Sequence, residues 1–125
     1  MIGIDLIKIS RMQSLMDRFG EKGLSRFLIQ EEINLVKSAK SAAAYWAAKE
    51  AFSKALGTGI GAQCSFYDIK IYKESSGAPK IAVSHKLIET FAIIDVALSI
   101  THDGEYAIAV VDIKLSTPAN KVQKF

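Results

Sequence analysis

The side chains best suited to a catalytic or binding role are an isolated carboxylate and a carboxylate–lysine pair. Asp5 lies within a strongly apolar N-terminal segment, where a strand could present it as a ligand for a hard metal ion. The structural alternative is a solvated residue at a sheet edge. Glu50 and Lys54 are four residues apart, a spacing that also suits an ordinary ion pair on a helix surface. Trp46, one turn earlier on the same stripe, favours a functional role, because an exposed tryptophan is unusual.

A glycine-rich segment and a histidine are two further candidates. GTGIG (57–61) could let backbone N–H groups approach an anion closely. It follows the expected helix, however, where the helix dipole disfavours phosphate, and the alternative is a simple helix stop. His102 lies immediately before Asp103 and Gly104. An imidazole there could contact a phosphate or move a proton, or it could be structural.

Composition excludes several classes of protein. The 125 residues predict one domain, and the net charge of +3 arises wholly from three lysines in segment 114–125. The rest of the chain is neutral overall, so nothing indicates nucleic-acid binding. The single Cys64 excludes a disulfide framework and a cysteine-cluster metal site. No signal peptide or membrane span is expected, which predicts a cytoplasmic protein. Motifs for serine or cysteine acyl chemistry are missing.

Hydrophobic periodicity predicts an N-terminal strand followed by helices. Segment 2–7 alternates, with Ile2, Ile4 and Leu6 expected on the core face and Asp5 on the opposite face. Further segments are expected to form a helix over 11–19 capped by Ser10, a helical stretch over 23–37 and a polar loop over 37–41.

The clearest predicted element is a helix over 42–56. Ser41 suits its N-cap, Gly57 suits the position after its end, and alanine is the best helix former. Tyr45 falls on a broad packed face rich in alanine. The opposite face is expected to carry Trp46, Lys49, Glu50, Ser53 and Lys54.

After the glycines the period changes from 3.6 to 2, which predicts an antiparallel meander with one inserted helix. Its expected strands cover 66–73, 80–83, 95–101 and 105–113, with Tyr67, Ile69 and Ile71 inward in the first. A helix capped by Ser84 is expected to extend to about residue 92, and Asp103-Gly104 is expected to form a hairpin turn. The fold class is therefore α+β. A single domain over 1–113 and a loose tail over 114–125 are expected.

The motifs, taken in order, resemble one family. They are Gly3-Ile4-Asp5 with Arg11, RFLIQEE (26–32), WAAKEAFSKALGTGIG (46–61), SFYDIKI (65–71), Gly77 to Pro79, SITH (99–102) and YAIAVV (106–111). This set resembles the bacterial holo-[acyl-carrier-protein] synthases, the short members of the 4′-phosphopantetheinyl transferase superfamily. The resemblance covers residues 2–113. It implies a 4′-phosphopantetheinyl transferase-like fold, with an N-terminal strand and helices followed by an antiparallel sheet.

The resemblance also implies a reaction. The phosphopantetheine arm of coenzyme A moves to a serine of an apo-acyl carrier protein, adenosine 3′,5′-bisphosphate leaves, and the product serves fatty acid biosynthesis. By the same resemblance Asp5 and Glu50 hold Mg²⁺, and Glu50 or a metal-bound water accepts the serine proton. Further implied coenzyme A contacts are Lys54 and His102 at phosphates, and Gly57, Thr58 and Gly59 along the cleft, with N–H groups facing the ligand.

Partners follow from charge and from the resemblance. Arg11 and Arg18 share a helix edge and Arg26 follows, which suits docking of a small acidic carrier protein. The family resemblance implies a homotrimer with active sites at subunit boundaries. One departure is Tyr45, where many relatives carry arginine. The alternatives are a Mg²⁺-dependent phosphohydrolase that uses Asp5 and Glu50, and a non-enzymatic module that binds acidic helices.

Overall fold

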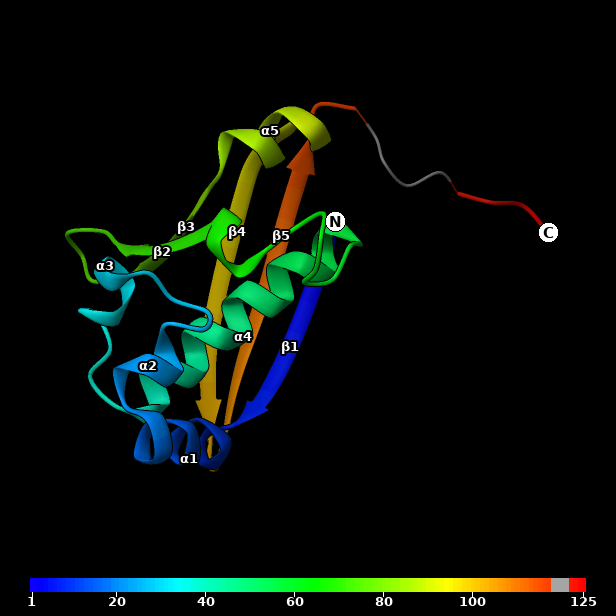
Figure 1. Cartoon of the computed structure of the whole chain (residues 1–125). Helices are drawn as coiled ribbons and strands as arrows, with labels where there is room; N and C mark the ends of the chain where they lie inside the picture. The colour runs from blue at the N-terminus through cyan, green and yellow to red at the C-terminus, as the bar shows by residue number, and fades with distance from the viewer. Residues whose placement is uncertain (118–121) are drawn as a thin grey trace.

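One long helix lies across a three-stranded sheet, and shorter elements flank both (Figure 1). The computed structural model describes residues 1–117 and 122–125. No helix within these residues is both long and apolar enough to cross a membrane. In chain order the elements are β1 (Ile2–Lys8), α1 (Ile9–Phe19), α2 (Glu21–Leu24), α3 (Gln30–Ile33), α4 (Ala39–Leu56), the 3₁₀ turn η1 (Phe66–Asp68), β2 (Ile69–Lys73), β3 (Pro79–Val83), α5 (His85–Phe91), β4 (Ile93–Asp103) and β5 (Tyr106–Leu115).

The strands form two sheets instead of the single meander that the sequence predicts. One sheet has the order β1-β5-β4, all antiparallel, and the other is the β2-β3 hairpin. β1 therefore pairs with the last strand of the chain, a long-range contact that periodicity does not reveal. The buried Ala107 and Ala109 of β5 face α4, whose own inner face is largely alanine. Small side chains on both layers let helix and sheet approach closely. The α+β class is confirmed.

β1 faces the opposite way from the prediction. Ile2, Ile4 and Leu6 are 73%, 58% and 55% exposed, whereas Gly3 and Ile7 are buried against α4. The physical reason is the contact at Gly3. A Cβ atom there would lie 1.9 Å from the carbonyl oxygen of Ala51, a distance that no side chain can occupy. The strand thus buries its smallest residue, and Asp5, two residues further on, lies on the same inner face.

This contact leads to a prediction for Gly3→Ala. The added methyl group must push β1 away from α4, so we expect a loss of at least about 1–3 kcal/mol in the free energy of unfolding. We also expect any function of the Asp5 carboxylate to be lost, because Asp5 moves with the strand. Chemical denaturation would measure the change in stability. Gly61→Ala is the matched control, since a Cβ at Gly61 meets no atom within 4 Å. Equal stability of the two variants would contradict the packing argument.

Several helix boundaries differ from those predicted. α1 begins at Ile9 with Lys8 at its N-cap position, and α4 begins at Ala39 after Ser38. The Ser41 hydroxyl accepts hydrogen bonds from the backbone N–H groups of Lys37 and Ser38, so Ser41 closes the first turn from inside. Segment 23–37 is not one helix but contains the end of α2 and the short α3, joined by turns. Gly57 ends α4 as predicted, in the left-handed conformation with φ 87°.

The second half follows the predicted order with local changes. Ser84 caps α5 through a hydrogen bond from the Leu87 N–H group, as expected. Residues 66–68 form η1 instead of a strand, and Tyr67 is exposed instead of inward. β5 continues to Leu115, two residues beyond the predicted boundary at 113. The expected loose tail includes residues 118–121, which lie outside the described residues.

Candidate active site

The tertiary fold brings Asp5, Glu50 and Lys54 to one place. Asp5 lies on the inner face of β1, and Glu50 and Lys54 lie on successive turns of α4. The Lys54 ammonium group donates to Asp5 Oδ1 over 2.9 Å and to the Ile4 carbonyl over 3.3 Å. Its partner is thus the carboxylate on β1, and the surface pair with Glu50 does not form. The hydrogen bond to Asp5 raises the pKa of Lys54, so the ammonium stays charged at neutral pH.

Glu50 is half-buried, and its charged form is disfavoured at this position. Burial raises the pKa of Glu50, the charge of Asp5 raises it further, and Lys54 acts in the opposite direction. The two carboxylates are therefore close enough to repel each other. A divalent cation between like charges removes that repulsion, and oxygen ligands from two carboxylates suit Mg²⁺, which fills its remaining positions with water and phosphate oxygens. The residues present fit a magnesium site.

The glycine-rich segment does not offer its N–H groups as predicted. The backbone N–H groups of Gly57, Thr58 and Gly59 all donate to the Ser53 carbonyl, at 3.1–3.2 Å. They cap the C-terminus of α4, where carbonyls otherwise lack partners. This corrects the expectation that these groups face the coenzyme A ligand. The segment still follows Lys54 directly, so it borders the carboxylate site.

His102 lies apart from the carboxylates within one chain. In the sheet register it pairs with Ala107, which pairs with Ile7 on the far side of β5. His102 lines an open pocket of about 240 Å³ together with Ser41, Tyr45 and Lys73. None of Asp5, Glu50 and Lys54 lines this pocket. Tyr45 is buried at its edge, as its helix position predicts, and burial raises the pKa of its phenol.

Two of the three arginines line a second pocket, whose walls include residues of β1 and α4. Arg11 and Arg26 line an open pocket of about 270 Å³ whose apolar lining includes Ile7, Trp46 and Phe66. Ile7 follows Asp5 on the same face of β1, and Trp46 precedes Glu50 by one helical turn. The pocket is therefore lined by the same two elements that carry the carboxylates, two residues along β1 from Asp5 and one turn along α4 from Glu50.

The remaining arginine is linked to the pocket through an aromatic ring. Arg18 and Arg26 both lie over Phe19, at 5.2 and 4.5 Å from its ring centroid. Such contacts favour arginine side chains held against a ring instead of freely rotating. The three predicted docking residues therefore lie on or next to α1. Arg26 both lines the pocket and contacts the Phe19 ring.

Three residues of α4 do not lie where the sequence pattern predicts. Trp46 does not project into water, since it packs on Phe27 and Phe66 with ring centroids 5.1 and 4.9 Å apart. Lys49 and Ser53 are wholly buried. Lys49 forms an ion pair with the equally buried Glu32 at 2.9 Å. The signal in the sequence is the alanine content around α4, which indicates a helix packed on most sides, including the side that carries Lys49.

Comparison with known proteins gives one consistent family. Residues 1–111 match the family model of the 4′-phosphopantetheinyl transferase superfamily. The holo-[acyl-carrier-protein] synthase of Sulfurimonas denitrificans is 62% identical over 122 residues, which cover 98% of this chain and 100% of that protein. The crystal structure of Helicobacter pylori holo-[acyl-carrier-protein] synthase in complex with coenzyme A has a TM-score of 0.87 at 45% identity, covering 91% of this chain and 100% of that one.

A Bacillus anthracis holo-(acyl-carrier-protein) synthase, solved in complex with CoA (3′,5′-ADP), has a TM-score of 0.76 at 37% identity over 92% of this chain and 96% of that one. The fold and the family match together define a phosphopantetheinyl transferase. Within that superfamily the chain belongs to the holo-[acyl-carrier-protein] synthases. The resemblance that the ordered motifs carry is thereby confirmed.

Proposed function

We propose that this enzyme transfers the 4′-phosphopantetheine group of coenzyme A to a serine of an apo-acyl carrier protein in the cytoplasm, for fatty acid biosynthesis. Adenosine 3′,5′-bisphosphate is the other product, and Mg²⁺ is required. The observation that carries the proposal is the convergence of Asp5, Glu50 and Lys54 from β1 and α4. Bound Mg²⁺ would neutralise pyrophosphate charge, and Asp5 and Glu50 are the residues that would hold it.

The chain's own side chains suit the remaining tasks. Lys54 is half exposed, so its ammonium group can leave Asp5 and contact a phosphate whose charge grows as the phosphorus–oxygen bond breaks. Glu50, whose pKa is raised by burial and by Asp5, is a suitable acceptor for the serine proton. His102 reaches a coenzyme A phosphate only if a second subunit supplies it, because within one chain it lies in another pocket.

An exposed apolar sheet face supports the homotrimer. Ile2, Ile4 and Leu6 of β1 pair with β5, where Val110 is also exposed on the same face. A contiguous apolar surface of this kind is uncommon on a monomer and favours burial between copies. In the proposed trimer the His102 pocket of one copy meets the Asp5–Glu50 pair of another, so that each active site lies at a subunit boundary.

The arginine edge leads to a prediction about carrier docking. We expect Arg11→Glu and Arg26→Glu to raise the KM for an acidic carrier protein by roughly tenfold or more, because each converts attraction into repulsion at the docking surface. The KM for coenzyme A should change far less. Steady-state kinetics at two salt concentrations would measure both, with Lys80→Glu on β3 as a control of equal charge change. Equal effects of all three variants would contradict a local docking surface.

The intact mass of an apo-acyl carrier protein tests the proposed function. The carrier would be incubated with the enzyme, coenzyme A and Mg²⁺, with and without EDTA. We expect the carrier mass to rise by one phosphopantetheine group when Mg²⁺ is present without EDTA. We expect no rise when EDTA chelates the Mg²⁺. No gain with several carriers from a folded sample would contradict the proposal. Phosphate release from simple esters would then indicate a phosphohydrolase, and carrier binding without turnover would indicate a binding module.

A further inference from the structure

A buried lysine beside the proposed active site has no role in the chemistry described so far. Lys49 precedes Glu50 on α4 and is 0% exposed. Its ammonium group donates three hydrogen bonds: to the Phe27 carbonyl at 2.8 Å, to the Phe66 carbonyl at 3.0 Å and to Glu32 Oε1 at 2.9 Å. An ammonium group has three protons, so every one of its donors is used. The lysine thereby fixes two distant backbone segments at one point of α4.

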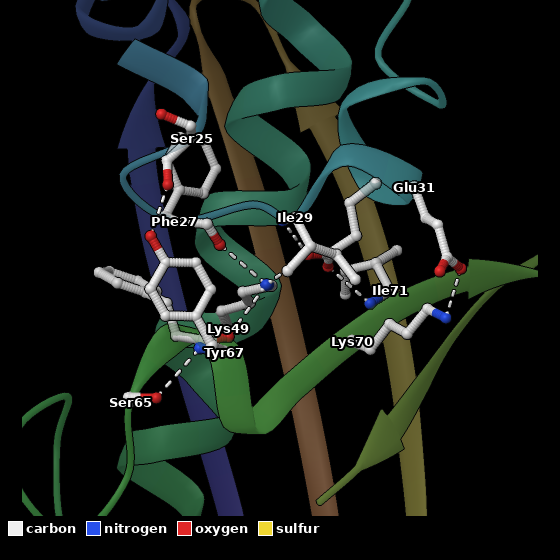
Figure 2. Close-up of polar contacts among 11 residues, drawn as sticks. Ser25, Phe27, Ile29, Glu31, Lys49, Ser65, Tyr67, Lys70 and Ile71 are labelled. Carbon is white, nitrogen blue, oxygen red and sulfur yellow. Dashed lines mark hydrogen bonds and ion pairs between the residues drawn. The ribbon is translucent and has the colours of Figure 1, made fainter. Parts of the chain in front are cut away.

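Glu32 extends the same connection. Its Oε1 accepts the Ile29 N–H at 2.9 Å and its Oε2 accepts the Ile71 N–H at 2.8 Å. In Figure 2 the dashed lines from Ile29 and Ile71 meet between the segment around Phe27 and strand β2. The pair thus joins residues 27–32 to residues 66–71 through a single turn of α4.

The two joined segments form walls of the pocket that residues of β1 and α4 also line. Phe66 lines the pocket directly, and Arg26, next to Phe27, lines it as well. The rings of Phe27 and Phe66 pack on Trp46 from two sides, and their centroids are 6.0 Å apart. The position of Trp46 and the direction of Arg26 therefore depend on how far apart these segments are held.

A second, exposed contact connects the same segments at the rim. The Tyr67 hydroxyl donates to the Ser25 carbonyl, directly before Arg26 (Figure 2). Lys49 acts from the interior and Tyr67 from the surface on the same two stretches of backbone. Two independent contacts therefore hold these two segments at a fixed distance. This indicates that the distance between them matters for the pocket.

We propose that Lys49 is a positioning residue for carrier-protein recognition, which sets the separation of residues 25–27 from residues 66–67 and so the shape of the pocket lined by Arg26, Trp46 and Phe66. The inference rests on the proposed function, in which the carrier docks at this surface. A buried ion pair is seldom the most stable solution for a core, since apolar side chains of similar volume can do as well. What the charge supplies here is a fixed geometry, because three acceptors from two segments must meet one ammonium group.

The test compares Lys49→Met with Tyr67→Phe and with Lys70→Met as control. Lys70 forms an exposed ion pair with Glu31. This pair also joins residues 27–32 to residues 66–71, but it lies on the surface outside the pocket lining, where such pairs contribute little. For each variant, kcat and the KM for apo-acyl carrier protein and for coenzyme A would be measured separately. Trp46 is the single tryptophan, so acrylamide quenching of its fluorescence reports on the pocket directly.

We expect Lys49→Met to raise the carrier KM by about tenfold or more and to leave the coenzyme A KM within about twofold. Its Trp46 fluorescence should be quenched more readily. Tyr67→Phe should raise the carrier KM by a smaller factor, and Lys70→Met should leave it unchanged. A merely structural role would lower the amount of active enzyme and leave both KM values as they are.

An unchanged carrier KM in folded Lys49→Met would overturn the inference. Should that variant fail to fold, an unchanged carrier KM in Tyr67→Phe would overturn it instead. Both outcomes leave wild-type transfer intact and so contradict only the inference. Loss of transfer in the wild-type enzyme would instead contradict the proposed function.

Discussion

Asp5→Asn and Glu50→Gln are each expected to lower the rate of phosphopantetheine transfer by roughly 10²–10⁴-fold. Asp5 and Glu50 are the two carboxylates that converge from β1 and α4, and the charge of Asp5 raises the pKa of Glu50. Removing either charge halves the anionic ligand set of the proposed metal site. Glu50→Gln also removes the proposed proton acceptor.

The same variants separate function from folding. Glu50 binds its proton more tightly in the folded state than in the unfolded chain, so ionised Glu50 costs stability above its unfolded pKa. Without metal, Glu50→Gln should therefore be at least as stable as the wild type at neutral pH. As pH falls from the raised pKa of Glu50 towards its unfolded pKa, Glu50 becomes protonated in the folded wild type. The difference in the free energy of unfolding between the wild type and Glu50→Gln should then disappear.

Intact-mass assays over a range of Mg²⁺ concentrations would measure the loss of transfer, and thermal unfolding would measure stability. Glu105→Gln is the matched control, since Glu105 is an exposed carboxylate after β4 with a long surface contact to Lys8. It should retain full activity. If Glu50→Gln kept more than about a tenth of the wild-type rate at saturating Mg²⁺, Glu50 would be neither ligand nor proton acceptor.

Glu32→Leu is expected to lower the free energy of unfolding by about 3–5 kcal/mol. The substitution leaves the Lys49 ammonium group buried without its counter-ion. It also removes the acceptor of two backbone N–H groups, those of Ile29 and Ile71. Buried donors without partners are costly because water cannot replace the lost bond.

The neighbouring Glu31 provides the control for this prediction. Its carboxylate pairs with Lys70 on the surface, where both side chains are exposed. Such pairs contribute about 0–1 kcal/mol, so Glu31→Leu should change stability little. Urea denaturation of both variants would give the two values. Similar losses for Glu31→Leu and Glu32→Leu would mean that the buried network contributes no more than a surface ion pair.

Local motifs and their order can be recognised in the amino-acid sequence. It predicts the long alanine-rich helix and its end at Gly57, the cap of α5 at Ser84 and the turn at Gly104, and all of these are present. These features depend on a few neighbouring residues, because caps, left-handed glycines and helix propensity act within one or two turns. The family can also be recognised from the sequence, because several motifs occur together in one order along the chain.

Which residues are buried is harder to predict. The alternation of β1 correctly indicates a strand, but it favours the apolar residues for the core, whereas Gly3 packs against α4. A period of two defines two faces and leaves open which one is covered. The helical projection places Lys49 on the exposed face of α4 for a related reason: its partners, Phe27, Glu32 and Phe66, come from segments on both sides of it in the sequence.

The family, the α+β class and the residue types that could hold a metal ion and a phosphate all follow from the order of residues along the chain. Two features of the site depend instead on long-range packing: Asp5 meets Lys54, and His102 lies in another pocket. The difference comes from the range of the interactions. Propensities and caps are local, whereas the pairing of β1 with β5 and the packing of α4 join residues far apart in the sequence, such as Gly3 and Val111.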